Sequence, residues 1–308
     1  MLSKRRRRSN VVSIMDFIAN FMNSDQDPIA WSRTRESEGW QVLGCADHFW
    51  SGQHTFPHLW VTLATMAAST RRPLLTSSFA NNLFRSPVEF AQAALQLQSV
   101  SGGRFEAGLG AGWSRDEAIG AGIGYPSAGV RAGRYIEAVQ IVRALLATGM
   151  CSFHGEHYQV DVPAIGPLPQ CGPPPLVASL GGNRTIRNIA PLVDRVELKL
   201  ISAATRNGEL DLAELAAIPQ QHLMDLVDKV RAVNTTVPLG VFILCGVGTD
   251  RRTTAIEAML GDSYLGGFFG EPAKVAHSMM ALADAGIDRV QISPFDDASF
   301  ALLSPHLF

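Results

Sequence analysis

Three groups of residues that could do chemistry each follow an apolar, strand-like segment of the chain. In the first, Asp47 and His48 bring together a carboxylate and an imidazole, either as an acid–base pair or as a structural hydrogen bond. A direct dyad is disfavoured, because adjacent residues of a strand point to opposite faces of the sheet. His48 is therefore a catalytic candidate if the end of its strand faces an active site.

The second group is the glycine-rich stretch 101–113, S-G-G-R-F-E-A-G-L-G-A-G-W. Glycine weakens a strand, and close approach by a ligand or by another backbone is one reason to keep it there. The stretch is not a dinucleotide fingerprint, because Trp113 stands where the third glycine is required, and no lysine follows in the P-loop position. We expect Gly110, Ala111 and Gly112 to border a different kind of ligand.

The third group, Gly181-Gly182-Asn183-Arg184, separates a strand-like segment from a helix-like one. Backbone N–H groups at a helix N-terminus bind anions, and the helix dipole and a nearby arginine strengthen that binding. The other interpretation is a plain turn with an exposed arginine, and these residues leave both open.

Side chains near these groups could complete a pocket. Trp50 and Trp113 could form an aromatic wall, and Glu117 could either face the pocket or lie exposed in the first turn of a helix. The histidines at 48, 54 and 58 do not have the spacing of a metal triad. Four widely spaced cysteines without a C-x-x-C pair disfavour a metal site and a disulfide framework, and are typical of reduced thiols in the cytoplasm.

Length and charge limit the class of protein. The chain has 308 residues, of which 46% are hydrophobic, enough for one large barrel or two ordinary domains. A net charge of −2 argues against a nucleic-acid partner. The basic block 4–8 predicts a disordered tail over residues 1–10, with a membrane or nucleic-acid arm as the alternative. No apolar run is long enough for a signal peptide or a spanning helix.

Strand-like and helix-like segments alternate along the chain. The helix over 131–146 is predicted to stop at Gly149, and Ser86-Pro87-Val88-Glu89 is a capping box that predicts a helix start. Apolar strands separated by amphipathic helices are typical of a parallel sheet covered by helices. Eight such units predict a (β/α)8 TIM barrel over residues 11–308, as a single domain. The expected strands are 12–17, 41–46, 73–79, 104–110, 175–180, 193–198, 237–245 and 289–293.

The barrel places the three chemical groups at one end, because active sites of this fold lie at the C-terminal ends of the strands. The strand over 73–79 ends there as well, in S-S-F-A-N-N. The segment 151–175 holds too many prolines for a helix or a central strand, and long loops of this kind are often functional. We expect this insertion to pass over the barrel mouth.

Several separate motifs follow one another in a fixed order. With them, the chain resembles the luciferase-like monooxygenase superfamily of flavin- and deazaflavin-dependent oxidoreductases, from about Asn10 to the C-terminus. The motifs are E-S-E-G-W and A-D-H-F (36–49), F-R-S-P (84–87), the glycine stretch (101–113), F-H-G-E-H-Y (153–158), S-L-G-G-N (179–183), and G-E-P-A-K-V-A with A-G-I-D-R-V (270–290).

The resemblance implies a flavin-type cofactor across the strand ends and a non-proline cis peptide bond at Ser78-Phe79, whose bulge would support the cofactor ring. It implies that 181–184 bind the cofactor phosphate and that His48 approaches ring and substrate. Residues expected to contact the cofactor are Asp47, Ser78, Phe79, Asn81, Gly110, Ala111, Gly112, Gly181, Gly182, Asn183 and Arg184. Residues expected to contact the substrate are Trp50, Trp113 and Glu117.

The function implied by the resemblance is hydride transfer between the deazaflavin coenzyme F420 and a small organic substrate, with His48 handling the accompanying proton. An FMN-dependent monooxygenase that uses oxygen is one alternative. A non-catalytic flavin- or deazaflavin-binding protein is another, because Trp113 replaces an acid that supplies a proton in the sugar-phosphate dehydrogenases of this family; Asn81-Asn82 also replaces a more apolar pair. A cytoplasmic homodimer without nucleic-acid or membrane partners is expected.

Overall fold

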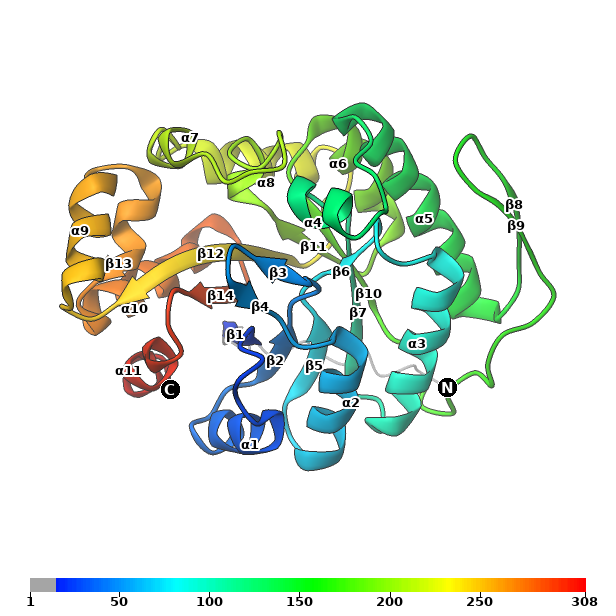
Figure 1. Ribbon diagram of the computed structural model, residues 1–308, viewed down its shortest axis with the longest axis horizontal. Coiled ribbons are helices and arrows are strands. Elements are labelled where there is room, and N and C mark those ends of the chain that lie inside the picture. The colour runs from blue at the N-terminus through cyan, green and yellow to red at the C-terminus, as the bar shows by residue number, and fades with distance from the viewer. Residues whose placement is uncertain (1–14) are drawn as a thin grey trace, which may run out of the picture.

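The computed structural model describes residues 15–308, which form a closed parallel barrel with helices around it (Figure 1). Strands pair in the order β1, β2, β5, β7, β10, β11, β12, β14, and β14 pairs with β1 again. The predicted (β/α)8 barrel is therefore confirmed. Its strands are β1 (Asp16–Phe21), β2 (Val42–Cys45), β5 (Leu74–Ser77), β7 (Phe105–Gly110), β10 (Leu176–Leu180), β11 (Arg195–Leu198), β12 (Leu239–Val247) and β14 (Arg289–Pro294).

The first strand lies further along the chain than predicted. It was expected over 12–17 and runs from Asp16 to Phe21. Asp16 pairs with Arg289 at 3.1 Å, and Asn20 is buried at the opposite end of the strand. Both polar side chains therefore have places inside the barrel. The predicted tail over 1–10, like residues 12–14, lies outside the described residues.

Helices surround the barrel, with smaller elements at its ends (Figure 1). Ser86 Oγ accepts a hydrogen bond from Glu89 N at 3.0 Å, which confirms the predicted helix start. The helices are α1 (Pro28–Ser37), α2 (Leu59–Ser69), α3 (Pro87–Val100), α4 (Arg115–Gly120), α5 (Ala128–Thr148), α6 (Asn183–Ile189), α7 (Leu212–Ala216), α8 (His222–Arg231), α9 (Arg251–Leu260), α10 (Pro272–Met280) and α11 (Ala298–Leu307). Outside the eight barrel strands lie four 3-10 turns and the short strands β3 (Trp50–Ser51), β4 (His54–Thr55), β6 (Ala80–Asn81) and β13 (Phe269–Gly270).

A charged cluster fills the barrel interior near the N-terminal ends of the strands. Arg289 on β14 contacts Asp16 on β1 and Glu106 on β7, and is 3% exposed. Burial raises the pKa of Glu197 on β11 to about 8 against the opposing charges of Arg289 and Arg195, so its carboxyl is largely neutral at pH 7. The barrel interior is therefore packed at the N-terminal ends of the strands, and open space is left at their C-terminal ends.

The insertion after α5 does not cover the barrel mouth, and that prediction is wrong. It begins as an antiparallel hairpin of β8 (Cys151–His154) and β9 (Gln159–Val162), which lies at the edge of the molecule beyond α5 (Figure 1). The Glu137 carboxylate on α5 accepts hydrogen bonds from three successive backbone N–H groups of the hairpin turn, 156–158, at 2.8–3.0 Å. These bonds hold the hairpin on the outer side of the helix.

Residues 15–308 contain no helix that is long and apolar enough to cross a membrane. Within the same residues no three side chains of His, Cys, Asp or Glu gather as metal ligands. All four cysteines are free.

Gly108 lets the backbones of β5 and β7 approach each other closely. A Cβ atom there would lie 1.9 Å from the carbonyl oxygen of Ser77 and 2.9 Å from the ring of Phe79. The Ser77 hydroxyl also bridges the strands, accepting from Gly108 N at 2.9 Å and donating to Gly108 O at 2.7 Å. No side chain fits at this position unless the strands move apart.

The substitution Gly108→Ala is therefore expected to lower the free energy of unfolding by about 3 kcal/mol, because the added methyl group forces a backbone shift. Urea denaturation followed by circular dichroism measures the change. Gly129→Ala in α5 is the matched control, because a Cβ there meets nothing within 4 Å and alanine is favoured in a helix. Equal denaturation midpoints for the two variants would contradict the close approach.

Candidate active site

A cavity of about 420 Å³ opens at the C-terminal ends of the barrel strands. Most residues that the sequence assigned to the site line it; Trp50, Glu117, Asn183 and Arg184 do not. The predicted residues in the cavity wall are Asp47, His48, Ser78, Phe79, Asn81, Gly110, Ala111, Gly112, Trp113, Gly181 and Gly182. Strand ends thus converge on one space as the barrel prediction required.

His48 is oriented by Glu117 on α4. Its Nδ1 lies 2.6 Å from Glu117 Oε2, and the other carboxylate oxygen accepts from the backbone N–H groups of Phe49 and Trp50 at 2.6 and 3.3 Å. Burial opposes ionisation of Glu117, but the hydrogen bond and charge of His48 and the bond from Phe49 outweigh it and lower its pKa. Glu117 is 1% exposed and does not line the cavity, so it binds the imidazole from outside the cavity. The expectation that it contacts the substrate is therefore corrected.

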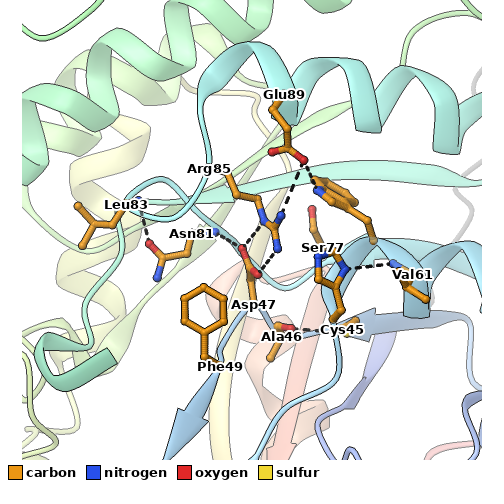
Figure 2. Close-up of polar contacts among 12 residues, drawn as sticks. Cys45, Ala46, Asp47, Phe49, Val61, Ser77, Asn81, Leu83, Arg85 and Glu89 are labelled. Atoms are coloured by element: carbon orange, nitrogen blue, oxygen red, sulfur yellow. Dashed lines mark hydrogen bonds and ion pairs between the residues drawn. The ribbon is translucent and has the colours of Figure 1, made fainter. Parts of the chain in front are cut away.

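Asp47 makes a separate set of contacts from His48. Its carboxylate accepts hydrogen bonds from Asn81 N and from Nε and Nη2 of Arg85, each at 2.8 Å (Figure 2). Arg85 in turn lies over the ring of Trp60 at 5.6 Å and contacts Glu89 at 3.7 Å. Both interpretations offered by the sequence, the acid–base pair and the structural hydrogen bond between Asp47 and His48, are therefore wrong, because Asp47 binds the segment that follows β5 and His48 binds Glu117.

That segment contains the backbone bulge implied by the family resemblance. The peptide bond between Ser78 and Phe79 is cis, as expected. Gly110 faces the bulge as Gly108 does, since a Cβ at Gly110 would lie 3.2 Å from Cβ of Phe79. Gly112 has a φ of +81°, and a Cβ there would lie 2.3 Å from Asn81 Oδ1. The alternate glycines of β7 therefore make room for the bulge, and Gly110 and Gly112 also line the cavity.

The floor of the cavity holds polar atoms without partners. Asn20 Oδ1, Ser78 Oγ and Gln291 Oε1 are buried and have no hydrogen-bond partner among residues 15–308. Gly44 leaves space between two of them, because a Cβ there would lie 2.2 Å from Asn20 Oδ1 and 2.4 Å from Ser78 Oγ. A buried polar atom without a partner is costly, so the floor is suited to a ligand that supplies hydrogen bonds. Sequence reasoning missed Asn20 and Gln291, whose signal is a polar residue inside an apolar strand.

Only part of the predicted phosphate turn faces the cavity. Gly181 and Gly182 line it, and Gly182 caps α6 without a side-chain hydrogen bond to the first turn. Arg184 instead donates from Nη1 to the carbonyl of Gly129 on α5 at 3.1 Å. Neither Arg184 nor Asn183 reaches the cavity wall, because the helix turns their side chains outward. Lys199, Arg131 and Arg206, which the sequence did not single out, supply positive charge to the wall.

The two candidate tryptophans lie in different places. Trp113 lines the cavity, with its ring 5.8 Å from the ring of His48. Trp50 lies on β3 outside the cavity, where it stacks on Phe49 and packs so closely on Gly120 that a Cβ there would lie 2.7 Å from its ring. The expectation that Trp50 contacts substrate is therefore wrong, because the β3–β4 hairpin turns the ring toward α4.

Comparison with known proteins places the chain in a family. A family model described as luciferase-like monooxygenase matches residues 36–212, more than half of the chain. The chain therefore belongs to the luciferase-like monooxygenase family, and the resemblance is confirmed.

Individual relatives share parts of the sequence. An F420-dependent glucose-6-phosphate dehydrogenase of Beutenbergia cavernae is 31% identical over 212 residues, which cover 65% of this chain and 61% of the relative. A pyrimidine monooxygenase, RutA, of Stutzerimonas stutzeri is 36% identical over 110 residues, 35% of this chain and 30% of the relative. The chain thus matches less than two thirds of the length of either protein.

Solved structures share the fold over nearly the whole chain. A structure described as an F420-dependent secondary alcohol dehydrogenase in complex with an F420–acetone adduct superposes with a TM-score of 0.73, covering 96% of this chain and 99% of that one. The sequence identity is 15%, so the likeness shows the fold alone.

The contacts of Asp47 predict the effect of removing its charge. Asp47→Asn leaves the buried Arg85 with only the half-exposed Glu89 as counter-charge, and is expected to lower the free energy of unfolding by about 3 kcal/mol. Urea denaturation measures the loss. Glu89→Gln, which removes the other and half-exposed partner of Arg85, is the control and is expected to cost less than about 1 kcal/mol. A loss for Asp47→Asn no larger than for the control would show that the carboxylate does not hold this segment.

Proposed function

We propose that the protein is an oxidoreductase that uses the deazaflavin coenzyme F420 to oxidise or reduce a small organic substrate. The observation that carries the proposal is His48 in the cavity wall, with one ring nitrogen fixed by a buried carboxylate. Similarity to F420-dependent dehydrogenases supports the choice of cofactor. The fold shared with an F420-dependent alcohol dehydrogenase is consistent with it.

The cavity fits such a cofactor. Gly181 and Gly182 would face its phosphate with backbone N–H groups, and Gly110, Ala111 and the bulge at Ser78-Phe79 would border its ring. The unpartnered floor atoms offer hydrogen bonds to the polar edges of a ring or of a substrate beside it. When bound, the deazaflavin supplies the carbon that donates or accepts a hydride.

His48 would transfer the proton that accompanies the hydride. With Glu117 accepting from Nδ1–H, the neutral imidazole keeps its lone pair at Nε2, which has no hydrogen-bond partner among residues 15–308. Nε2 can then accept the proton of a substrate hydroxyl during oxidation, or return it to a carbonyl oxygen during reduction. Trp113 beside the imidazole excludes water from one side of it.

An FMN-dependent monooxygenase is the second candidate. The segment shared with the pyrimidine monooxygenase supports it, and a flavin phosphate could use the same glycines. A cofactor-binding protein without turnover is the third candidate, since Trp113 stands in place of an acid. Fluorescence titration of the purified protein with F420 and with FMN separates the cofactors. Micromolar binding of FMN without binding of F420, together with oxygen uptake, would replace the first proposal by the second.

Substitution of His48 tests the proton transfer. His48→Ala is expected to lower kcat about 10²–10⁴-fold with an unchanged Kd for F420, because general acid–base catalysis contributes about that much. Glu117→Gln keeps an acceptor for the backbone of Phe49 but weakens the hold on the imidazole, and a smaller loss of kcat is expected. Bleaching of the deazaflavin absorbance measures turnover, and circular dichroism checks the fold. Unchanged turnover in a folded His48→Ala protein would exclude the proton role.

A further inference from the structure

Lys199 brings a free positive charge to the cavity. It follows β11 directly, lies partly buried in the cavity wall, and its Nζ has neither a carboxylate nor a hydrogen-bond acceptor in contact among residues 15–308. A buried or half-buried lysine normally has such a partner. The ammonium therefore has its hydrogen-bonding capacity available to a ligand.

The carboxylates in and next to the cavity wall are already paired, and Arg131 and Arg206 are the other positive side chains of the wall. Asp47 pairs with Arg85, and Glu117 pairs with His48. Arg131 on α5 donates to the carbonyl oxygens of Pro126 and Arg206, and lies over the ring of Tyr125 at 4.2 Å. Its positive charge adds to that of Lys199, since no carboxylate of the described residues offsets it. The electrostatic potential on this side of the cavity favours an anion.

Trp113 connects Lys199 to the candidate catalytic histidine. The Lys199 ammonium lies 5.6 Å from the Trp113 ring, and the His48 ring lies 5.8 Å from it. Both polar groups therefore lie next to the same indole in the cavity wall. A small ligand with a polar group at each end could therefore form hydrogen bonds of about 2.8 Å with both of them.

We propose that Lys199 binds a carboxylate of the substrate, so that the substrate is a small hydroxy acid or the corresponding oxo acid. The inference rests on the proposed function and names its substrate class. A carboxylate would form a charge-assisted hydrogen bond with the ammonium, and the charge of Arg131 beside it adds to the attraction. In the oxidation, the C–H bond of the carbinol carbon breaks and its hydride goes to oxidised F420. The hydroxyl proton goes to His48, a ketone forms, and the carboxylate on Lys199 is unchanged.

A binding experiment tests the carboxylate site without any turnover. Calorimetric titration of the cofactor-free protein with pentanoate and with pentanamide compares a carboxylate with a neutral group of the same shape. Pentanoate is expected to bind at least tenfold more tightly, and Lys199→Met is expected to remove that preference. Lys199→Arg keeps the charge and is expected to retain most of it. Lys229→Met, which removes an exposed lysine of α8, is the control for overall charge.

Turnover with a matched pair of alcohols extends the test to the substrate. In the F420-loaded protein, 4-hydroxypentanoate and 2-pentanol differ only in a terminal carboxylate and methyl group. The ratio of their kcat/KM values is expected to fall on the order of tenfold to a hundredfold in Lys199→Met, and to stay unchanged in the surface control Lys229→Met. An unchanged Kd for F420 in that variant is expected, and separates a substrate carboxylate from the anionic groups of the cofactor.

Several results would overturn the inference. They are equal binding of pentanoate and pentanamide by the unsubstituted protein, a preference that survives in Lys199→Met, or weaker F420 binding as the main effect of that substitution. A protein that binds pentanoate through Lys199 but does not bind F420 would instead contradict the proposed function and leave the carboxylate site standing.

The pH dependence of pentanoate binding has a defined direction. Burial, and then the charge of Arg131 on α5, lower the pKa of Lys199 to about 8, and His48, which follows β2, lies beside the same Trp113 ring as Lys199. Above pH 8 the ammonium loses its proton, so the Kd of pentanoate is expected to rise about tenfold per pH unit. Lys199→Arg stays charged and is expected to remove this rise up to pH 10. The same rise in Lys199→Arg would assign it to another group.

Discussion

The hydrogen bonds of Asp47 hold the active end of the barrel together. One carboxylate, at the end of β2, fixes the backbone of Asn81 and the guanidinium of Arg85, which belong to the segment between β5 and α3. The cis bulge lies within that segment, and His48 is the next residue along the chain after Asp47. Because all three donors are largely withdrawn from water, the ion pair depends on its geometry for most of its strength. Asp47 therefore fixes the bulge, and Glu117 orients the imidazole of the residue that follows Asp47.

The glycines of β7 are the counterpart of this arrangement. The sequence alone allowed two explanations for them, close approach by a ligand or by another backbone. At Gly108 the approaching group is the carbonyl of Ser77, and at Gly110 it is Phe79. β7 has glycine at both positions because the bulge occupies the space of a side chain. The bulge, Gly110 and Gly112 together form the cavity surface that a ligand could contact. Trp113, the next residue after Gly112, continues the cavity wall with an aromatic side chain.

The parts of the molecule that were predictable are those fixed by short-range pattern. Apolar runs separated by amphipathic helices predicted seven strands close to their observed places, because the pattern that identifies such a strand lies within the segment itself. The first strand was predicted too early, over 12–17, because its place depends on the pairing of Asp16 with Arg289, which lies 273 residues away. The same holds for Glu117, whose role depends on His48 across 69 residues. Lys199 gave no signal, because the absence of a partner is a property of the folded chain. Trp50 and Arg184 were misplaced where a hairpin or helix, rather than a strand, sets the direction of the side chain.

The unpartnered floor atoms couple the stability of the fold to its ligands. Asn20, Ser78 and Gln291 keep polar atoms in a buried place where apolar side chains of similar size would be more stable. A molecule that pairs with them binds the folded chain and not the unfolded one. At a hundredfold excess over its Kd, such a molecule adds about 2.7 kcal/mol to the free energy of unfolding. The fraction of chains that stay folded in a cell would then follow the supply of that molecule.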